Sequence, residues 1–146
     1  MGPEPNAPNT IDDCKDGNSG DYRVDEQIDA ITVRSGRIDG TGANESMAEG
    51  QFVTITASVY AYDTNDRADF YYTADAFNPS WVYVGSLQSL AEGDTEDLQI
   101  EFRLPRGSNQ AVRVKYDYEG NITTCPESVS NDESRVSKFL DICHLH

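Results

Sequence analysis

A run of acidic side chains near the N-terminus is the first candidate for chemistry in this sequence. Seven carboxylates fall within eighteen residues: Asp12, Asp13, Asp16, Asp21, Asp25, Glu26 and Asp29. Carboxylates this close repel one another unless they are solvated or share a cation, and Ca²⁺ takes about six to eight oxygen ligands from flexible loops. We therefore expect a structural calcium site, with a solvated acidic loop as the alternative. The expected ligands are Asp16, Asp21, Asp25, Glu26 and Asp132.

The three cysteines allow one closed disulfide. If the chain is oxidised, we expect Cys14 to pair with Cys125, because both lie in polar stretches at either end of the strand-rich region. Closing a loop of this length stabilises a fold by about 4 to 5 kcal/mol in the chain-entropy treatment. Cys143 is then either free or available for an intermolecular bond. A metal site of Cys143, His144 and His146 is the alternative.

Two glycosylation sequons are present, at Asn44 and Asn121. Residues 1–5 show neither the basic nor the apolar segment of a signal peptide, so none is expected in this form of the chain. The expectation of a secreted, extracellular protein therefore depends on the sequons and the cysteines together. Extracellular disulfides persist because that compartment is oxidising.

Aromatic residues form the second candidate site. Trp81 and Tyr83 follow a turn at Asn78-Pro79-Ser80, and more tyrosines lie on neighbouring segments. An exposed Trp and Tyr pair would suit a sugar ring or a protein partner. The alternative is cross-strand aromatic packing, which stabilises sheets.

Residues that would support catalysis are sparse, so we do not expect an enzyme. The only histidines are His144 and His146, at the extreme end of the chain. The sequence has no glycine-rich nucleotide motif and no His-Glu-x-x-His motif. Paired carboxylates could serve a glycosidase, but sequence alone cannot fix their separation.

The elements that must position these residues are β-strands, which the sequence shows by apolar residues at every second position. The clearest is residues 51–62, where Val53, Ile55, Ala57, Val59 and Ala61 point one way and form a core face, while Thr and Tyr residues point the other way and form a surface. Shorter strands are predicted at residues 31–34, 68–73, 81–85, 98–104 and 112–118. In the last of these, apolar residues alternate with Arg113, Lys115 and Asp117, and we expect charges outside the acidic run to form a solvated surface of the sandwich. Residues 136–142 fit a strand or a helix, and we favour a strand.

These patterns predict an all-β, antiparallel β-sandwich, jelly-roll-like or immunoglobulin-like. We expect a single domain with an extended N-terminal arm at 1–19, a sandwich at 20–142 and a tail at 143–146. The length of 146 residues is suited to one domain.

Charge and hydropathy exclude two classes of partner. The formal net charge is −15, which would repel a phosphate backbone, so we expect no nucleic-acid partner. No stretch approaches the roughly 20 apolar residues that a membrane-spanning helix needs.

Several segments resemble a non-catalytic β-sandwich accessory domain found near the C-termini of secreted bacterial peptidases and related extracellular proteins. The family's Cys-x-Asp-Gly-x-Ser-Gly segment, which leads to Asp-Glu-Ser, is matched by residues 14–20 and by Asp25 and Glu26. The likeness continues through residues 68–76, 78–81, 104–114 and Cys125. Where the family has an acidic Tyr-Asp-Asp-x-Asp-Asp-Leu cluster, this chain departs from it, with Ser134 and Arg135 in place of the last two acids. The resemblance implies an accessory module without catalysis of its own.

Taken together, we expect a non-enzymatic extracellular structural or adhesive module, stabilised by calcium and open to self-assembly and glycosylation. Its partners would be other protein subunits, in a homo-oligomer or filament, or surface glycans. The alternative is a carbohydrate- or substrate-binding accessory domain of a secreted hydrolase, which would use Trp81 and Tyr83.

Overall fold

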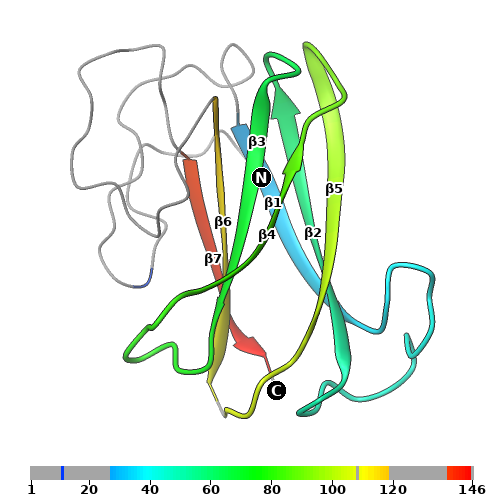
Figure 1. Cartoon of the computed structure of the whole chain (residues 1–146), viewed down its shortest axis with the longest axis vertical. Helices are drawn as coiled ribbons and strands as arrows, with labels where there is room; N and C mark the ends of the chain where they lie inside the picture. The colour runs from blue at the N-terminus through cyan, green and yellow to red at the C-terminus, as the bar shows by residue number, and fades with distance from the viewer. Residues whose placement is uncertain (1–10, 12–26, 108, 119–137, 146) are drawn as a thin grey trace.

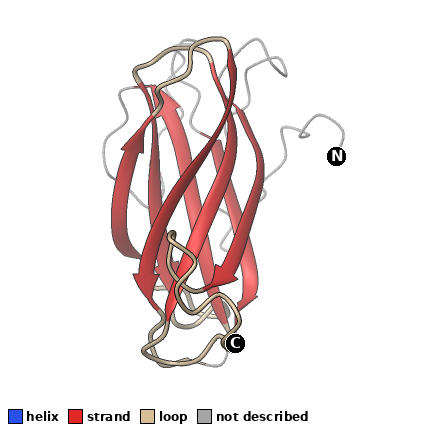
Figure 2. Ribbon diagram, turned by 90° about the vertical axis from the view of Figure 1, so that its right-hand side faces the viewer, coloured by secondary structure: helices blue, strands red, loops and turns tan. Residues whose placement is uncertain are grey.

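A computed structural model describes residues 11, 27–107, 109–118 and 138–145, with the backbone only at 118 and 138–145. Within these residues the chain forms seven strands and no helix, as the sequence predicts (Figure 2). The strands are β1 (Gln27–Ser35), β2 (Phe52–Ala61), β3 (Asp66–Thr73), β4 (Val82–Gln88), β5 (Asp94–Arg103), β6 (Gln110–Tyr118) and β7 (Lys138–Leu145). No helix in this part of the chain is long and apolar enough to cross a membrane.

The strands form two antiparallel sheets (Figure 1). One has three strands in the order β1-β2-β5, and the other has four in the order β4-β3-β6-β7. The edge strands are therefore β1 and β5 in the first sheet, and β4 and β7 in the second. Across the two sheets, β1 lies next to β7 and β4 lies next to β5.

Strand β2 follows its sequence pattern closely. The five residues predicted to form one face, Val53, Ile55, Ala57, Val59 and Ala61, are all inaccessible to solvent. The opposite face was expected to be a surface, and at Thr54 this expectation is wrong. Thr54 is buried because its hydroxyl donates a hydrogen bond of 2.8 Å to the carbonyl of Gly36, in the loop after β1.

One hydrophobic core takes residues from both sheets. Phe70 and Val114 of the four-stranded sheet belong to the same buried cluster as Ile55 and Leu98 of the three-stranded sheet. The rings of Tyr72 and Phe102 stack between the sheets with centroids 5.0 Å apart. Burial of each large apolar side chain contributes about 1.5–3 kcal/mol, so this shared cluster holds the sheets together.

Strand β6 departs from the predicted alternation of a buried and a solvated face. Val112, Val114 and Tyr116 face the core as expected. Arg113 and Lys115, which point the other way, are nevertheless buried, and so is Asp117. The expectation that the charged side chains form a solvated surface is therefore wrong for this strand.

Strand β7 confirms the preference for a strand at the end of the chain. It begins at Lys138 and continues through Leu145, so the expected tail beginning at Cys143 is wrong for residues 143–145. The strand extends further because it pairs along most of β6, with Gln110 opposite Leu145.

The loop between β1 and β2 folds back on itself at Gly36. This residue has φ of +90°, and a Cβ atom there would lie 2.6 Å from the backbone nitrogen of Ala43. Only glycine fits such a close approach without strain. Gly36 thereby lets the loop close tightly beside the end of β2.

Candidate docking edge

Most of the predicted site residues lie outside the described residues. The calcium ligands Asp16, Asp21, Asp25, Glu26 and Asp132 are all among them, as are Cys14, Cys125 and Asn121. The calcium site and the disulfide therefore remain predictions. Asn44 lies in the loop between β1 and β2, where it is exposed. In the described part of the chain, no group of three His, Cys, Asp or Glu side chains could hold a metal ion.

The predicted aromatic site lies at the start of β4, and its two members differ. Trp81 is half-buried, with the guanidinium of Arg113 lying 4.3 Å from the centre of its ring. Tyr83 is exposed, although its hydroxyl hydrogen-bonds with Ser86 at 2.6 Å and its ring lies 5.7 Å from that of Tyr71, tilted by 58°. Both rings are thus partly used by contacts within the protein.

The face of the four-stranded sheet that points away from the core carries a buried network of charges on β3 and β6. Asp69 pairs with Arg67 at 3.0 Å and with Lys115 at 3.7 Å, and Ser86 donates a hydrogen bond to its carboxylate. Lys115 also contacts Asp117 at 3.0 Å. Buried charges are costly unless paired, so this network fixes the register of β3, β4 and β6 from the side opposite the core.

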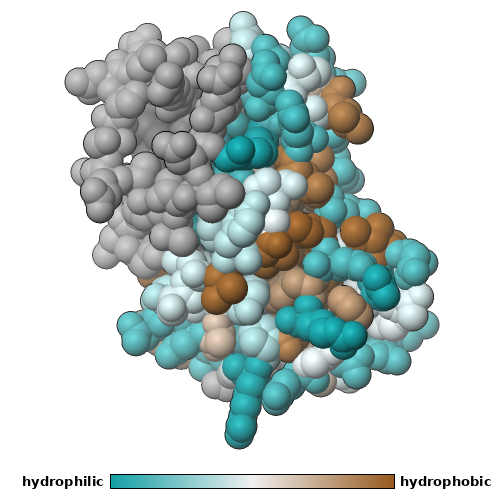
Figure 3. Space-filling view, viewed as in Figure 1, coloured by the Kyte–Doolittle hydropathy of each residue, from teal (hydrophilic) through white to brown (hydrophobic). Residues whose placement is uncertain are grey.

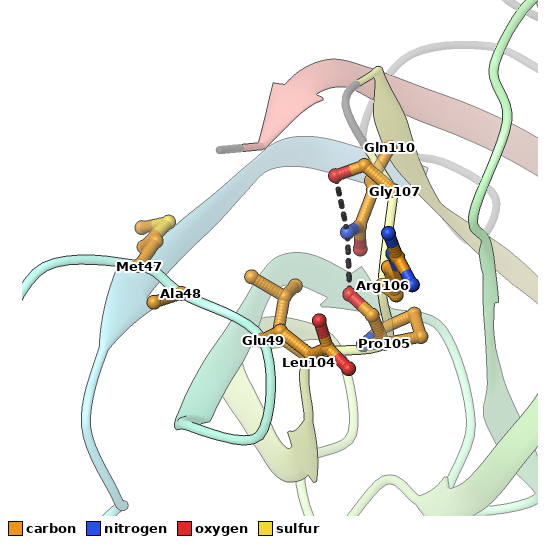
Figure 4. Close-up of a pocket in the computed structure, with 8 residues that line it drawn as sticks. All are labelled: Met47, Ala48, Glu49, Leu104, Pro105, Arg106, Gly107 and Gln110. Carbon is orange, nitrogen blue, oxygen red and sulfur yellow. Dashed lines mark hydrogen bonds between the residues drawn. The ribbon is translucent and has the colours of Figure 1, made fainter.

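A pocket of about 510 Å³ lies at the end of the fold where the loop before β2 meets the loop after β5 (Figure 4). Met47 and Leu104 contribute apolar side chains to it. The Gln110 side-chain amide donates hydrogen bonds to the carbonyls of Pro105, at 2.7 Å, and Gly107, at 3.1 Å. Its Oε1 atom is buried and accepts no hydrogen bond from the described residues. The side-chain amide of Gln110 is therefore used to hold the loop after β5 in place.

The same end of the three-stranded sheet carries an exposed ion pair. Arg37 Nη2 lies 2.8 Å from Glu101 Oε1. The hydrogen bond from Arg37, together with one from the backbone of Ile38, lowers the pKa of Glu101, and the same bond raises the pKa of Arg37. The guanidiniums of Arg37 and Arg103 both stack on Phe52, at 4.5 and 4.3 Å from its ring centre. This cluster satisfies its own charges and anchors the loop after β1.

Exposed apolar side chains gather around a different element, strand β4. Six large hydrophobic side chains are exposed in the described part of the chain: Ile38, Tyr62, Phe77, Val82, Tyr83 and Leu90. Four of these six lie on β4 or in the two loops that flank it. We call β4 together with Phe77 and Leu90 the docking edge.

Carboxylate-capped turns hold both flanking residues of the docking edge. Asp75 Oδ1 accepts hydrogen bonds from the backbone N–H groups of Phe77, at 2.9 Å, and Asn78, at 3.3 Å. Glu96 accepts hydrogen bonds from the N–H groups of Leu90, at 3.0 Å, and Ala91, at 3.1 Å. Phe77 and Leu90, which are 81% and 89% exposed, are therefore presented to solvent on fixed turns.

Strand β4 is also the only one of the four edge strands among the described residues without a charged side chain. Its sequence is VYVGSLQ, whereas β1, β5 and β7 each contain both acidic and basic residues. Natural edge strands usually carry charges, because these discourage pairing with other chains. A β-bulge can also discourage pairing with another chain, and β4 has one at Val84, between the pairs Phe70–Gly85 and Tyr71–Tyr83. Residues 85–88 of the strand are regular.

Apolar surface continues from β4 toward the neighbouring edge strand β5. A Cβ atom on Gly85 would lie 2.8 Å from the Cδ1 of Ile100, so the two edges approach closely. Val84, Leu87 and Ile100 pack against the core but are only partly buried. Figure 3 shows hydrophobic surface running through the middle of this face, where Figure 1 places β4 and β5 side by side.

The sequence predicts strand β4 but does not show that it lies at an edge of its sheet. The signal was available, because residues 76–91 contain no charged residue in a chain where 25% of residues are charged. Its meaning depends on which strand lies at an edge, and that is a property of the sheet order.

Neither a protein-family model nor a curated protein matches the chain.

Proposed function

We propose that this chain is a non-enzymatic structural or adhesive module that docks onto another protein through the docking edge. One observation carries the proposal: the uncharged strand at the edge of the four-stranded sheet and its two flanking loops hold four of the six large hydrophobic residues that are exposed in the described part of the chain. Exposed apolar patches of this kind mark protein interaction sites. Strand addition to such an edge uses main-chain hydrogen bonds for affinity and side-chain contacts for specificity.

The finer features expected from the sequence belong to the same proposal. The two sheets form an antiparallel sandwich, jelly-roll-like or immunoglobulin-like, with residues 1–19 as an extended arm. The module is extracellular, resembles the accessory domains of secreted peptidases, and carries a disulfide between Cys14 and Cys125. The exposure of Asn44 supports glycosylation there.

A carbohydrate-binding accessory domain is the second candidate. The exposed ring of Tyr83 beside Trp81 supports it, because sugars stack on aromatic faces. The contact of Arg113 with the Trp81 ring argues against it, since that ring face is already occupied.

Adhesion to whole cells separates the two candidates. Beads coated with the full chain are expected to be retained on cells of the organism that produces it. The variant Val82→Lys should reduce retention by about tenfold, because it places a charge on the pairing edge and removes an apolar contact. The matched control is Ile38→Lys, since Ile38 and Val82 have nearly equal exposure, 45% and 44%, and Ile38 lies outside the docking edge.

The same experiment also tests the second candidate, a carbohydrate-binding domain. If free oligosaccharides or Trp81→Ala abolish retention while Val82→Lys does not, the chain is a carbohydrate-binding domain. If wild-type beads are not retained, or if both Lys variants behave like wild type, the proposed docking function is wrong. Circular dichroism of each variant establishes that it is folded.

A further inference from the structure

We infer that the docking edge binds an extended segment of a partner protein in which apolar residues alternate with Lys or Arg. This inference rests on the proposed function and adds the chemistry of the partner. It follows from three properties of the described residues: the pairing edge, the apolar contacts beside it, and the charge of the surface around it.

The pairing edge requires an extended partner. Strand β4 pairs with β3 on one side, and no described strand pairs with its other side. Alternate backbone N–H and C=O groups of an edge strand point away from the sheet, so they can form a ladder with an added strand. Residues 85–88 are the regular part of β4, since they pair with residues 67–70 of β3 without a shift in register.

The apolar contacts require apolar residues at every second position of the segment. Side chains of an added strand would alternate between the two faces of the sheet. Those facing the β5 side would cover the partly exposed Val84, Leu87 and Ile100. At the two ends of the strand, Phe77 and Leu90 offer further apolar contacts.

The surrounding charge favours a segment that is basic as a whole. Residues 74–102, which include β4, both flanking loops and nearly all of β5, contain no Lys or Arg. They contain six acids: Asp75, Glu92, Asp94, Glu96, Asp97 and Glu101. Among the described residues, Glu101 is the only one of these six that forms an ion pair, with Arg37. A cationic segment would be attracted to this surface, and the net charge of −15 adds to the attraction at longer range.

The same charge disfavours a second copy of this chain as the occupant. Two β4 strands could pair without local repulsion, because neither carries a charge. Each copy would nevertheless bring a net charge of −15 to the other, and its residues 74–102 contain six acids and no Lys or Arg. Like charges brought together at an interface are unfavourable, so we assign the edge to a basic partner.

Three fluorescent, end-capped peptides test the inference by anisotropy with the full chain. The first alternates Val and Lys, the second replaces each Lys with Glu, and the third is the Lys peptide with alternate backbone nitrogens methylated. We expect the Lys peptide to bind at least about tenfold more tightly than either of the others. Val82→Lys should weaken its binding by about tenfold, Ile38→Lys should leave it unchanged, and added salt should weaken it.

Four outcomes would overturn the inference. Equal binding of the Glu peptide would remove the charge selectivity, and equal binding of the methylated peptide would remove the strand pairing. A wild-type dimer in sedimentation velocity, lost in Val82→Lys, would assign the edge to a second copy instead. Cell adhesion that depends on Val82 without binding of the Lys peptide would leave the proposed function standing and refute this inference alone.

Discussion

At the scale of single residues, Asp66 shows how an ordinary turn residue becomes a buried structural group. Its carboxylate is buried at the first position of β3, where Oδ2 accepts hydrogen bonds from the backbone N–H groups of Tyr62, at 2.8 Å, and Asp63, at 3.0 Å. Its Oδ1 atom has no hydrogen-bond partner in the described part of the chain. Burial raises the pKa of Asp66, and the nearby carboxylates of Asp63 and Asp117 add to the rise.

The raised pKa predicts how stability depends on pH. A carboxyl whose pKa is higher in the folded state contributes stability below its unfolded pKa of about 3.9, and loses it as pH rises through the folded value. Asp66→Asn cannot titrate, so its stability relative to wild type should increase as pH rises from acid to neutral. Asp66→Ala should lose about 1–3 kcal/mol at every pH, because the backbone N–H groups of Tyr62 and Asp63 lose their acceptor.

Urea denaturation at several pH values measures both effects. Asp94→Asn, at the exposed start of β5, controls for the removal of one negative charge from the whole molecule. A stability difference between wild type and Asp66→Asn that does not change with pH would contradict the prediction.

At the scale of elements, the period of two separates core from surface on β2 but not on β6. The outward face of β2 carries mainly hydroxyl side chains, such as that of Thr56, which accepts a hydrogen bond of 3.1 Å from the side-chain amide of Gln99 on β5. The outward face of β6 carries charges that are buried in ion pairs, such as Lys115 with Asp117. Sequence alternation is the same in both strands, so only the surroundings of each strand distinguish them.

Neighbouring positions of β2 should respond to truncation in very different ways. Ile55→Ala should destabilise the protein by about 2–5 kcal/mol, because it leaves a cavity in the shared core. Thr56→Ala should cost less than about 1.5 kcal/mol, the net value of one hydrogen bond at an exposed site. Equal losses for the two variants in chemical denaturation would show that β2 is not oriented as described.

At the scale of the whole molecule, acidity is the dominant property. The net charge of −15 favours bound cations and basic partners, and it opposes compaction of the chain. In the sequence the acids form two concentrations, one at residues 12–29 and the other at residues 92–101, in β5 and the loop before it. The first concentration remains a predicted calcium site, and the second supports the inferred basic partner.

Removing calcium should therefore lower the melting temperature if the first concentration binds it. A ligand at about 100 times its Kd stabilises by about 2.7 kcal/mol, which corresponds to a shift of roughly 5–10 °C for a chain of this size. Chelation should produce this loss, and Asp16→Asn with Asp21→Asn should abolish the response. Sodium chloride at matched ionic strength controls for simple screening of the charge. An equal melting temperature with and without chelator would refute the site.

The sequence by itself determined the strands, their inward faces and the all-β class, because alternation and turn residues act locally along the chain. The alternate apolar residues of two strands could be assigned to the core without any tertiary information: Val53, Ile55, Ala57, Val59 and Ala61 on β2, and Val112, Val114 and Tyr116 on β6. The burial of Asp66, Thr54 and Lys115 and the exposure of the uncharged strand β4 could not. Each of these depends on which segments distant in sequence lie beside the residue, and the order of strands in a sheet decides that. Only the tertiary structure shows that the uncharged strand β4 lies at the edge of its sheet, where no described strand pairs with its outer side.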